Sequence, residues 1–222
     1  MDAHLFPYAP LAPALILAAL GALAGWLTLG RLRTGFYRYD DDRPQRRLAW
    51  VVPAAGAVAG LTAYGLGDWA WPVPVTGALA AVAGVTLAAI DLDVHRLPRV
   101  LTWPCYPALA LLLTLCSLVT DDWHALRRAA LVGFALWAGY YLLHRLAPRG
   151  GLGRGDVTLA GLLGMALGWF GWEAAAVGTY LAFLMAGLAA GALLLTRRIT
   201  RSDRIAFGPA MIAGALLVLA AQ

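Results

Sequence analysis

The stretch PVPVTGALAAVAGVTLAAI, from Pro72 to Ile90, carries no charged residue and is followed directly by Asp91 and, two residues later, Asp93. A helix that crosses a bilayer needs about 20 apolar residues, so this stretch predicts a transmembrane helix. The acids at its end need their own explanation, because ionisable groups in membrane helices are costly and usually belong to a functional site.

The composition extends this prediction to the whole chain of 222 residues. Hydrophobic residues make up 61% of the chain and charged residues 13%, and the mean hydropathy is +0.72. These values lie far from those of soluble globular domains. We predict an all-α polytopic membrane protein, with about eight transmembrane helices in one bundle and a single domain over residues 1–222. The expected spans are Leu11–Gly30, Trp50–Leu66, Pro72–Ile90, Leu101–Val119, Ala125–Ala147, Val157–Phe170, Trp172–Thr196 and Ile205–Ala221.

The distribution of arginines predicts how the chain is oriented. All 17 basic residues are arginines, and only Arg127 and Arg128 belong to the alternate set of connections. The other 15 lie in Arg31–Arg47, Arg96–Arg99, Arg145–Arg154 and Arg197–Arg204. Connections rich in arginine stay on the cytoplasmic side of a membrane. We therefore expect both termini outside, and the loop 31–49 and the glycine-rich run Gly150–Asp156 at the cytoplasmic face. Topology explains the positive charge, so we expect membrane lipid and no nucleic acid as a partner.

The sequence offers no pattern for a metal, a cofactor or a disulfide. Cys105 and Cys116 fall in one expected helix, where a rise of about 1.5 Å per residue separates them by about 16 Å, too far for a bond. The chain has no zinc-type cluster of His and Cys, and no evident Ser-His or Cys-His pair. His144, near the inner end of the fifth span, is interpreted as an interfacial histidine with its hydrogen bonds satisfied.

Small and aromatic residues predict features of the packing. Pairs of glycines four residues apart let membrane helices approach closely, and we expect such packing within the chain. Tryptophans close to the outer connections are expected to form an aromatic belt at the water boundary. The glycine pairs are Gly56/Gly60, Gly164/Gly168 and Gly187/Gly191, and the tryptophans are Trp71, Trp123, Trp169 and Trp172.

Three aspartates near the cytoplasmic boundary carry the chemistry that the sequence suggests. Asp91 and Asp93 lie about 200° apart around a helix, so at most one can easily face the interior, and the spacing does not choose between them. Asp156 follows glycines that allow a sharp bend and a close approach of an extended substrate. Two carboxylates on separate helices can share a proton, so that one deprotonates a water while the other protonates a carbonyl oxygen. The pattern predicts aspartic peptidase chemistry without a metal.

The helix termini suggest which carboxylate does what. Asp156 is expected at the start of its helix, where the field of the helix favours the ionised form, whereas Asp91 lies at the end of its helix in the opposite field. We predict that Asp156 starts as the base and that Asp91 holds the proton.

Two motifs in this order resemble those of the bacterial type IV prepilin peptidases. Ile90-Asp91-Leu92-Asp93-x-x-x-Leu97-Pro98 resembles the first motif of that family, and Gly151-Leu152-Gly153-Arg154-Gly155-Asp156-Val157-x-Leu159 resembles its Gly-x-Gly-Asp motif. Phe207-Gly208-Pro209, at the start of the last span, is similar to a third feature of the family.

The resemblance implies that Asp91 and Asp156 are catalytic, with Asp93 a neighbour. It implies an intramembrane aspartic endopeptidase in the bacterial cytoplasmic membrane, with its catalytic face toward the cytoplasm. The substrate would be a prepilin or pseudopilin, cut after a glycine that precedes its hydrophobic helix. We assign further positions of the two motifs to the substrate-binding surface, namely Gly153, Gly155, Pro98 and Thr158.

The chain departs from the family pattern at three places. Thr158 stands where the family commonly has Lys, and Arg99 stands where it usually has Asp or Asn. The loop 31–49 contains no cysteine, whereas many members carry an insert there with Cys-x-x-Cys motifs that is associated with N-methylation of the pilin. We therefore do not expect methylation that depends on S-adenosylmethionine.

Other classes of membrane protein could use the same aspartates and glycines. A secondary transporter could use Asp91 and Asp156 as a proton or cation relay, with the glycines as a broken-helix site. That alternative does not explain why both acids lie at one edge. Presenilin-like proteases usually pair Tyr-Asp with Pro-Ala-Leu, and here Ile90 and not a Tyr precedes Asp91. A structural bundle without activity is the remaining alternative, and Thr158 in place of Lys is the feature that favours it.

Overall fold

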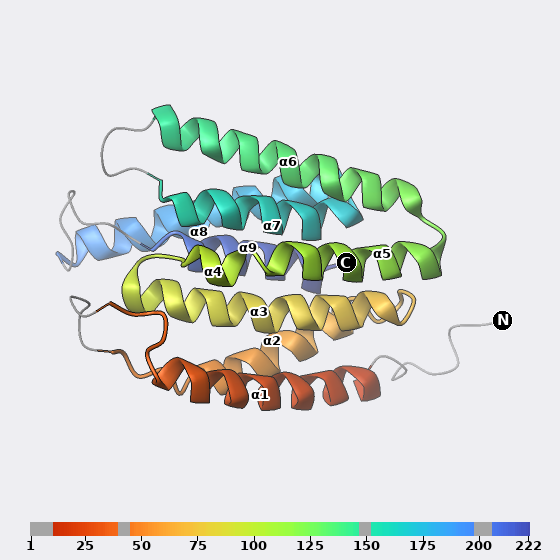
Figure 1. Ribbon diagram of the computed structural model, residues 1–222, viewed down its shortest axis with the longest axis horizontal. Helices are drawn as coiled ribbons and strands as arrows, with labels where there is room; N and C mark the ends of the chain where they lie inside the picture. The colour runs from red at the N-terminus through yellow and green to blue at the C-terminus, as the bar shows by residue number, and fades with distance from the viewer. Residues whose placement is uncertain (1–10, 40–44, 147–151, 198–205) are drawn as a thin grey trace.

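The computed structural model describes residues 11–39, 45–146, 152–197 and 206–222, and these residues form helices and connections without a strand (Figure 1). The helices are α1 (Leu11–Arg33), α2 (Val51–Gly65), α3 (Pro72–Val94), α4 (Arg99–Thr102), α5 (Cys105–Thr120), α6 (Trp123–Leu146), α7 (Arg154–Phe170), α8 (Trp172–Leu195) and α9 (Gly208–Ala220). The predicted all-α fold is confirmed.

Four segments of the described chain are long and apolar enough to cross a membrane. They are α1, α3, α8 and the segment Arg99–Thr120, which consists of α4 and α5, while α2 and α9 are shorter apolar helices. The protein is therefore a polytopic membrane protein. The number of eight crossings stays a prediction.

Two helix boundaries differ from the expected ones in a way that matters for the acids. α3 continues four residues beyond Ile90 to Val94, so Asp91 and Asp93 both lie on its last turns. The expected span Leu101–Val119 is interrupted before Cys105, because Pro104 has no N–H to donate within a helix.

The helices alternate in direction, so their connections gather at two ends of the bundle. The last turns of α1, α3 and α6 lie at the same end as the first turns of α4, α7 and α9, on the left in Figure 1. In sequence these turns border the connections rich in arginine. The alternation that the arginines predicted is therefore present in the fold.

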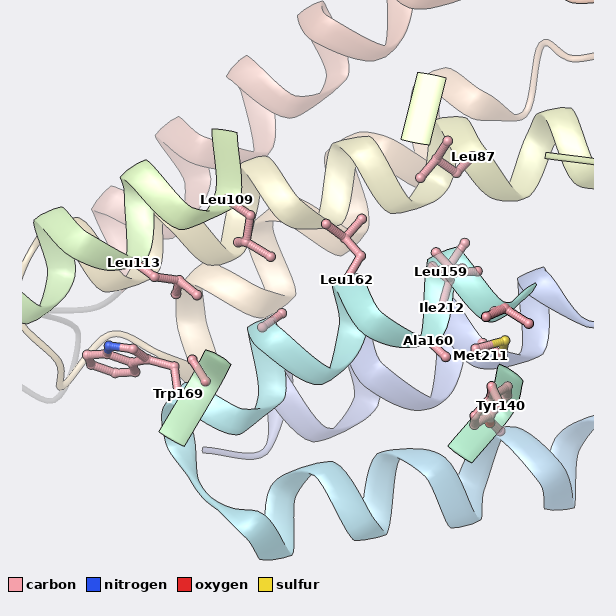
Figure 2. Packing of buried hydrophobic residues seen from close by; sticks show 14 of the residues in the cluster. Leu87, Leu109, Leu113, Tyr140, Leu159, Ala160, Leu162, Trp169, Met211 and Ile212 are labelled. Atoms are coloured by element: carbon pink, nitrogen blue, oxygen red, sulfur yellow. The ribbon is translucent and has the colours of Figure 1, made fainter. Parts of the chain in front are cut away.

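The largest apolar core lies where α3, α5, α6, α7 and α9 meet (Figure 2). Leu159 and Leu162 of α7 lie between Leu87 of α3, Leu109 of α5 and the side chains of α9. α7 is thus the central helix of this half, since most of its residues beyond Asp156 are buried.

Glycines bring α6 and α7 into close contact, as the spacing of Gly164 and Gly168 predicted. A Cβ atom on Gly168 would lie 2.6 Å from the Cβ atom of Val132 on α6, so no side chain fits there. Arg128 of α6 donates from Nε to the carbonyl oxygen of Gly168 over 2.9 Å. A cation is favourable at this end because the last carbonyls of a helix lack partners.

The other two glycine pairs differ from each other. Gly56 and Gly60 of α2 lie against alanines of α1, where an added Cβ atom would approach an alanine Cβ atom to 2.9 Å and 2.8 Å. At Gly187 and Gly191 no described atom lies within 4 Å of such a Cβ atom. The expectation of packing within the chain is therefore confirmed for the first pair and, for the described residues, wrong for the second.

Trp169 is buried in the core and does not face the surroundings of the bundle, so its assignment to an aromatic belt was wrong. Its exposed fraction is 2%, and its indole N–H donates to Ser117 Oγ over 2.9 Å. A tryptophan can be buried where its N–H finds an acceptor. The other three expected belt residues, Trp71, Trp123 and Trp172, are exposed.

We expect Gly168→Leu to destabilise the protein by about 1–3 kcal/mol, because the new side chain overpacks the contact between α6 and α7. The apparent Tm in detergent measures this effect. Gly187→Leu is the matched control, since its Cβ atom would meet open space and should leave the Tm nearly unchanged. Equal Tm values for the two variants would contradict the assigned contact.

Candidate active site

Asp91 is buried at the C-terminal end of α3, with 4% of its surface exposed. Its Oδ2 atom accepts a hydrogen bond from the backbone N–H of Gly208 over 3.1 Å. Gly208 is the first residue of α9, where helical N–H groups lack partners within the helix and favour an anion. A Cβ atom on Gly208 would lie 2.7 Å from this oxygen, so only glycine allows the contact.

Asp156 is the third residue of α7 and is partly exposed. Gly153 is the N-cap of the helix, and its backbone N–H donates to Asp156 Oδ2 over 3.1 Å. This arrangement is the acidic half of a capping box, which holds the carboxylate against the first turn. The expectation that Asp156 begins a helix is confirmed.

Packing brings the helix ends of the two aspartates together. Gly155, next to Asp156, lies against Leu97, six residues after Asp91. Leu159, one turn after Asp156, also lies beside Gly208, with its Cδ2 atom 3.5 Å from the position of a Cβ atom there. The first turn of α7 therefore lies between the end of α3 and the start of α9, and the fold brings together the two aspartates that the motifs paired.

Gly155 joins the two motifs directly. A Cβ atom on Gly155 would lie 2.9 Å from the Cβ atom of Leu97 and 3.3 Å from its backbone nitrogen. Pro98 follows with extended backbone, at φ −63° and ψ 129°, and is the N-cap of α4. Gly155 thus has a structural reason to be glycine, while the roles of Gly155 and Pro98 in substrate binding stay predictions.

Thr158 makes its hydrogen bonds within the protein. Its Oγ1 atom donates to the carbonyl oxygen of Gly155 over 2.8 Å, and its own carbonyl oxygen accepts from the Tyr106 hydroxyl over 2.6 Å. Tyr106 thereby ties α5 to the first turns of α7. Gly153, in contrast, is exposed at the helix start. Gly150 and Gly151 of the glycine-rich run lie outside the described residues.

His144 supports the segment that leads into α7. Its Nδ1 atom lies 2.6 Å from the carbonyl oxygen of Leu152, which is hydrogen-bonding distance. The interpretation of His144 as a histidine with satisfied hydrogen bonds is confirmed.

An aromatic cluster lies behind Gly208, on α6, α8 and the start of α9. The ring centroids of Phe183 and Phe207 are 5.2 Å apart, and that of Tyr140 lies 5.9 Å and 6.3 Å from them. The sequence could not predict that Tyr140 lies near the site, because α6 approaches the site through its packing on α7.

Asp93 is also buried, with 5% of its surface exposed, and it anchors the connection between α1 and α2. It accepts hydrogen bonds from the Tyr37 hydroxyl over 2.9 Å and from the backbone N–H of Arg46 over 2.8 Å. Arg38 forms an ion pair with the same carboxylate. Asp91 and Asp93 therefore face different neighbours, as their spacing predicted: Asp91 contacts α9 inside the bundle, and Asp93 is buried by the connection that follows α1.

Further contacts hold the same connection in place. Burial raises the pKa of the Tyr37 hydroxyl above its ordinary value, so the phenol stays protonated and can donate to Asp93. Gln45 donates from Nε2 to the carbonyl oxygen of Leu32 over 2.7 Å. The guanidinium group of Arg96 stacks on the ring of Tyr39, 4.1 Å from its centroid. Residues 31–39 and 45–49, the described parts of this loop, therefore lie against the end of α3 that carries Asp91.

The described residues contain no group of three or more His, Cys, Asp or Glu side chains that could hold a metal ion. Cys105 and Cys116 are both free, as their separation predicted.

The fold and the site define a polytopic helical membrane protein that brings two aspartates to the same end of its bundle. The sequence profile of the type IV leader peptidase family matches residues 78–195, which is more than half of the chain and contains Asp91 and Asp156. The protein belongs to this family.

Three relatives illustrate the similarity, and each is named a prepilin leader peptidase/N-methyltransferase. The chain is 33% identical over 136 residues to the protein of Aeromonas hydrophila, which covers 61% of this chain and 46% of that protein. It is 36% identical over 128 residues to the protein of Dickeya chrysanthemi, and the match covers 56% of this chain and 43% of that protein. It is 28% identical over 176 residues to the protein of Stutzerimonas stutzeri, and the match covers 78% of this chain and 58% of that protein.

The chain spans about half the length of the curated relatives that it matches. No solved structure matches it.

We expect Asp93→Ala to destabilise the protein by about 1–3 kcal/mol, because Tyr37 and the N–H of Arg46 lose their buried acceptor. The released connection should also be cut faster by trypsin between α1 and α2, which the sizes of the fragments report. Asp68→Ala is the control, since Asp68 is exposed and far from this connection in sequence. Unchanged cleavage in Asp93→Ala would show that the carboxylate does not anchor the connection.

Proposed function

We propose that this protein is an intramembrane aspartic endopeptidase that removes the leader peptide of type IV prepilins or pseudopilins. The observation that carries the proposal is the packing of the two family motifs, with Gly155 against Leu97. This packing brings Asp91 and Asp156 from different helices to the same end of the bundle. The names of the relatives, all prepilin leader peptidases, support the same reaction.

In the proposed mechanism one water lies between the two carboxylates. Asp156 removes a proton from the water, whose oxygen attacks the carbonyl carbon of the scissile peptide bond, and Asp91 gives its proton to the carbonyl oxygen. The tetrahedral intermediate then loses the amine, which takes the proton from Asp156, while Asp91 recovers its own proton. The reaction consumes one water and needs no metal and no covalent intermediate.

The different surroundings of the two aspartates support this division of roles. Asp156 is partly exposed and lies on a first helical turn, where water can reach it and where the helix favours a carboxylate. Asp91 is buried at the end of α3 and has one backbone donor, Gly208. We therefore assign the activation of water to Asp156 and the protonation of the carbonyl to Asp91.

The surroundings of the aspartates suggest how a substrate is bound. Gly153 is exposed and leaves its backbone accessible to an extended peptide, and Pro98 has extended backbone beside Gly155. Thr158 lies about one helical turn after Gly155 on α7. We propose that these four residues line the path of the segment to be cut, in a single domain surrounded by lipid.

The positive-inside distribution supports a site at the cytoplasmic face of the bacterial cytoplasmic membrane. In this proposal the loop 31–49 takes the place of the cysteine-containing insert of other members. Because this loop has no cysteine, N-methylation is not part of the proposed function. No observation favours the transporter alternative over membership in a peptidase family.

We expect Asp91→Asn and Asp156→Asn each to lower the rate of leader removal by about 10²-fold or more, because each variant removes one partner in proton transfer. The measurement is the mass of candidate prepilins after co-expression with each variant. Asp68→Asn is the control and should cleave like the wild-type chain, since Asp68 is exposed and lies outside both motifs.

Three outcomes decide this experiment. Intact prepilins with the wild-type chain, across all pilin-like proteins of the host, would overturn the proposal. Normal cleavage by either Asn variant would remove that aspartate from the mechanism. A cleaved product heavier by one methylene group would show that the protein also methylates.

We expect Gly208→Ala to lower kcat by about ten- to a hundredfold, because its methyl group would displace the Asp91 carboxylate from its position. Steady-state cleavage in detergent measures the change. Gly187→Ala adds the same methyl group where no described atom lies within 4 Å, and it should keep the wild-type kcat. A normal kcat in Gly208→Ala would mean that the contact of Asp91 with α9 does not matter for the reaction.

A further inference from the structure

A groove of about 280 Å³ opens between α3, α5 and α7, with Ile212 of α9 at its floor. Its lining consists of Leu, Ala, Ile, Gly and one Cys, so it presents no charge and no strong hydrogen-bonding group. Figure 2 shows Leu87, Leu109 and Leu162 pointing toward the space between their three helices. Leu79 and Ala108 at its edge are exposed, so the groove opens at the side of the bundle.

The groove leads to the two aspartates. Leu87 is four residues before Asp91 on α3, and Leu159 is three residues after Asp156 on α7, and both line the groove. One end of the groove therefore lies one helical turn from each carboxylate. From Leu87 the α3 side runs back to Leu79, which at about 1.5 Å per residue is a length of about 12 Å.

The shape of the lining suits a helix. A length of about 12 Å corresponds to about two turns of an α-helix. A cavity of about 150 Å³ holds one benzene-sized group, so this groove has room for about two large apolar side chains. Several lining residues have small side chains, namely Ala80, Ala83 and Gly84 of α3 and Ala108 of α5. Small residues of this kind let two membrane helices approach closely.

We propose that this groove is the docking site for the hydrophobic helix of the substrate. The inference rests on the proposed function, because it places the apolar segment of the prepilin along α3, α5 and α7. The segment to be cut then leaves the inner end of the groove and reaches Asp91 and Asp156. A docked helix fixes the distance between the scissile bond and the carboxylates, which an acyl chain of a lipid in the same groove would not do.

The test compares two alanine-to-tryptophan variants in proteoliposomes that contain a prepilin cleaved by the wild-type chain. Ala108→Trp fills the mouth of the groove, whereas Ala135→Trp adds the same side chain to an exposed position on α6 outside it. We expect Ala108→Trp to raise KM about three- to tenfold, the scale of one helix–helix contact in a membrane, with kcat within about twofold of wild type. Ala135→Trp should leave both constants unchanged.

The outcomes separate this inference from the proposed function. A wild-type chain that cleaves no prepilin refutes the function and the groove together. Cleavage by the wild-type chain with an unchanged KM in Ala108→Trp refutes the groove alone. An equal rise of KM in both tryptophan variants also refutes it, because the effect would then not depend on the groove.

Cross-linking provides a second measurement that does not depend on the folding of Ala108→Trp. Cys105 lines the inner part of the groove, whereas Cys116 is buried against Thr76 with a distance of 3.3 Å between Sγ and Oγ1. We expect oxidation to join Cys105 of the Asp156→Asn protein to single cysteines placed along one face of the prepilin helix. Cys105→Ser in the same background should abolish the product. No product at any position of the helix would overturn the docking site.

Discussion

Three carboxylates at one end of this bundle each accept a hydrogen bond from a backbone N–H at a helix start or in a connection. The pairs are Asp91 with Gly208, Asp93 with Arg46 and Asp156 with Gly153. A carboxylate inside an apolar bundle is costly unless donors compensate it. The helix starts and connections that provide these donors must therefore lie at the same end as the acids, and the arrangement of this end follows from that requirement.

This constraint connects parts of the chain that lie far apart in sequence. The start of α9 must reach the end of α3 to contact Asp91, and the start of α7 must lie between them. Gly155 and Gly208 permit these contacts because a side chain at either position would collide with Leu97 or with the carboxylate. The same packing leaves a gap between α3, α5 and α7 on the side that faces lipid, and the groove opens in this gap. Its inner end lies one helical turn from the aspartates.

The sequence predicted those features that depend on short stretches of chain. Long apolar runs predicted helices because each must satisfy its own backbone hydrogen bonds in lipid. Glycines followed by Asp156 predicted a helix start, and the spacing of Gly164 and Gly168 predicted close packing. The prediction failed for Trp169, which is buried because Ser117 on another helix offers an acceptor. The sequence also did not predict that Asp93 is buried, because its partners follow α1.

By itself the amino-acid sequence determined the helical membrane fold, the alternation of the helices and the two motif aspartates, since hydropathy, charge and motif spacing are properties of neighbouring residues. Only the tertiary structure decided which groups surround these aspartates. Gly208, Tyr140 and the connection held by Asp93 reach the site through packing between helices, and no local pattern records such contacts. The groove between α3, α5 and α7 has the same origin, because its shape depends on how three separate helices diverge.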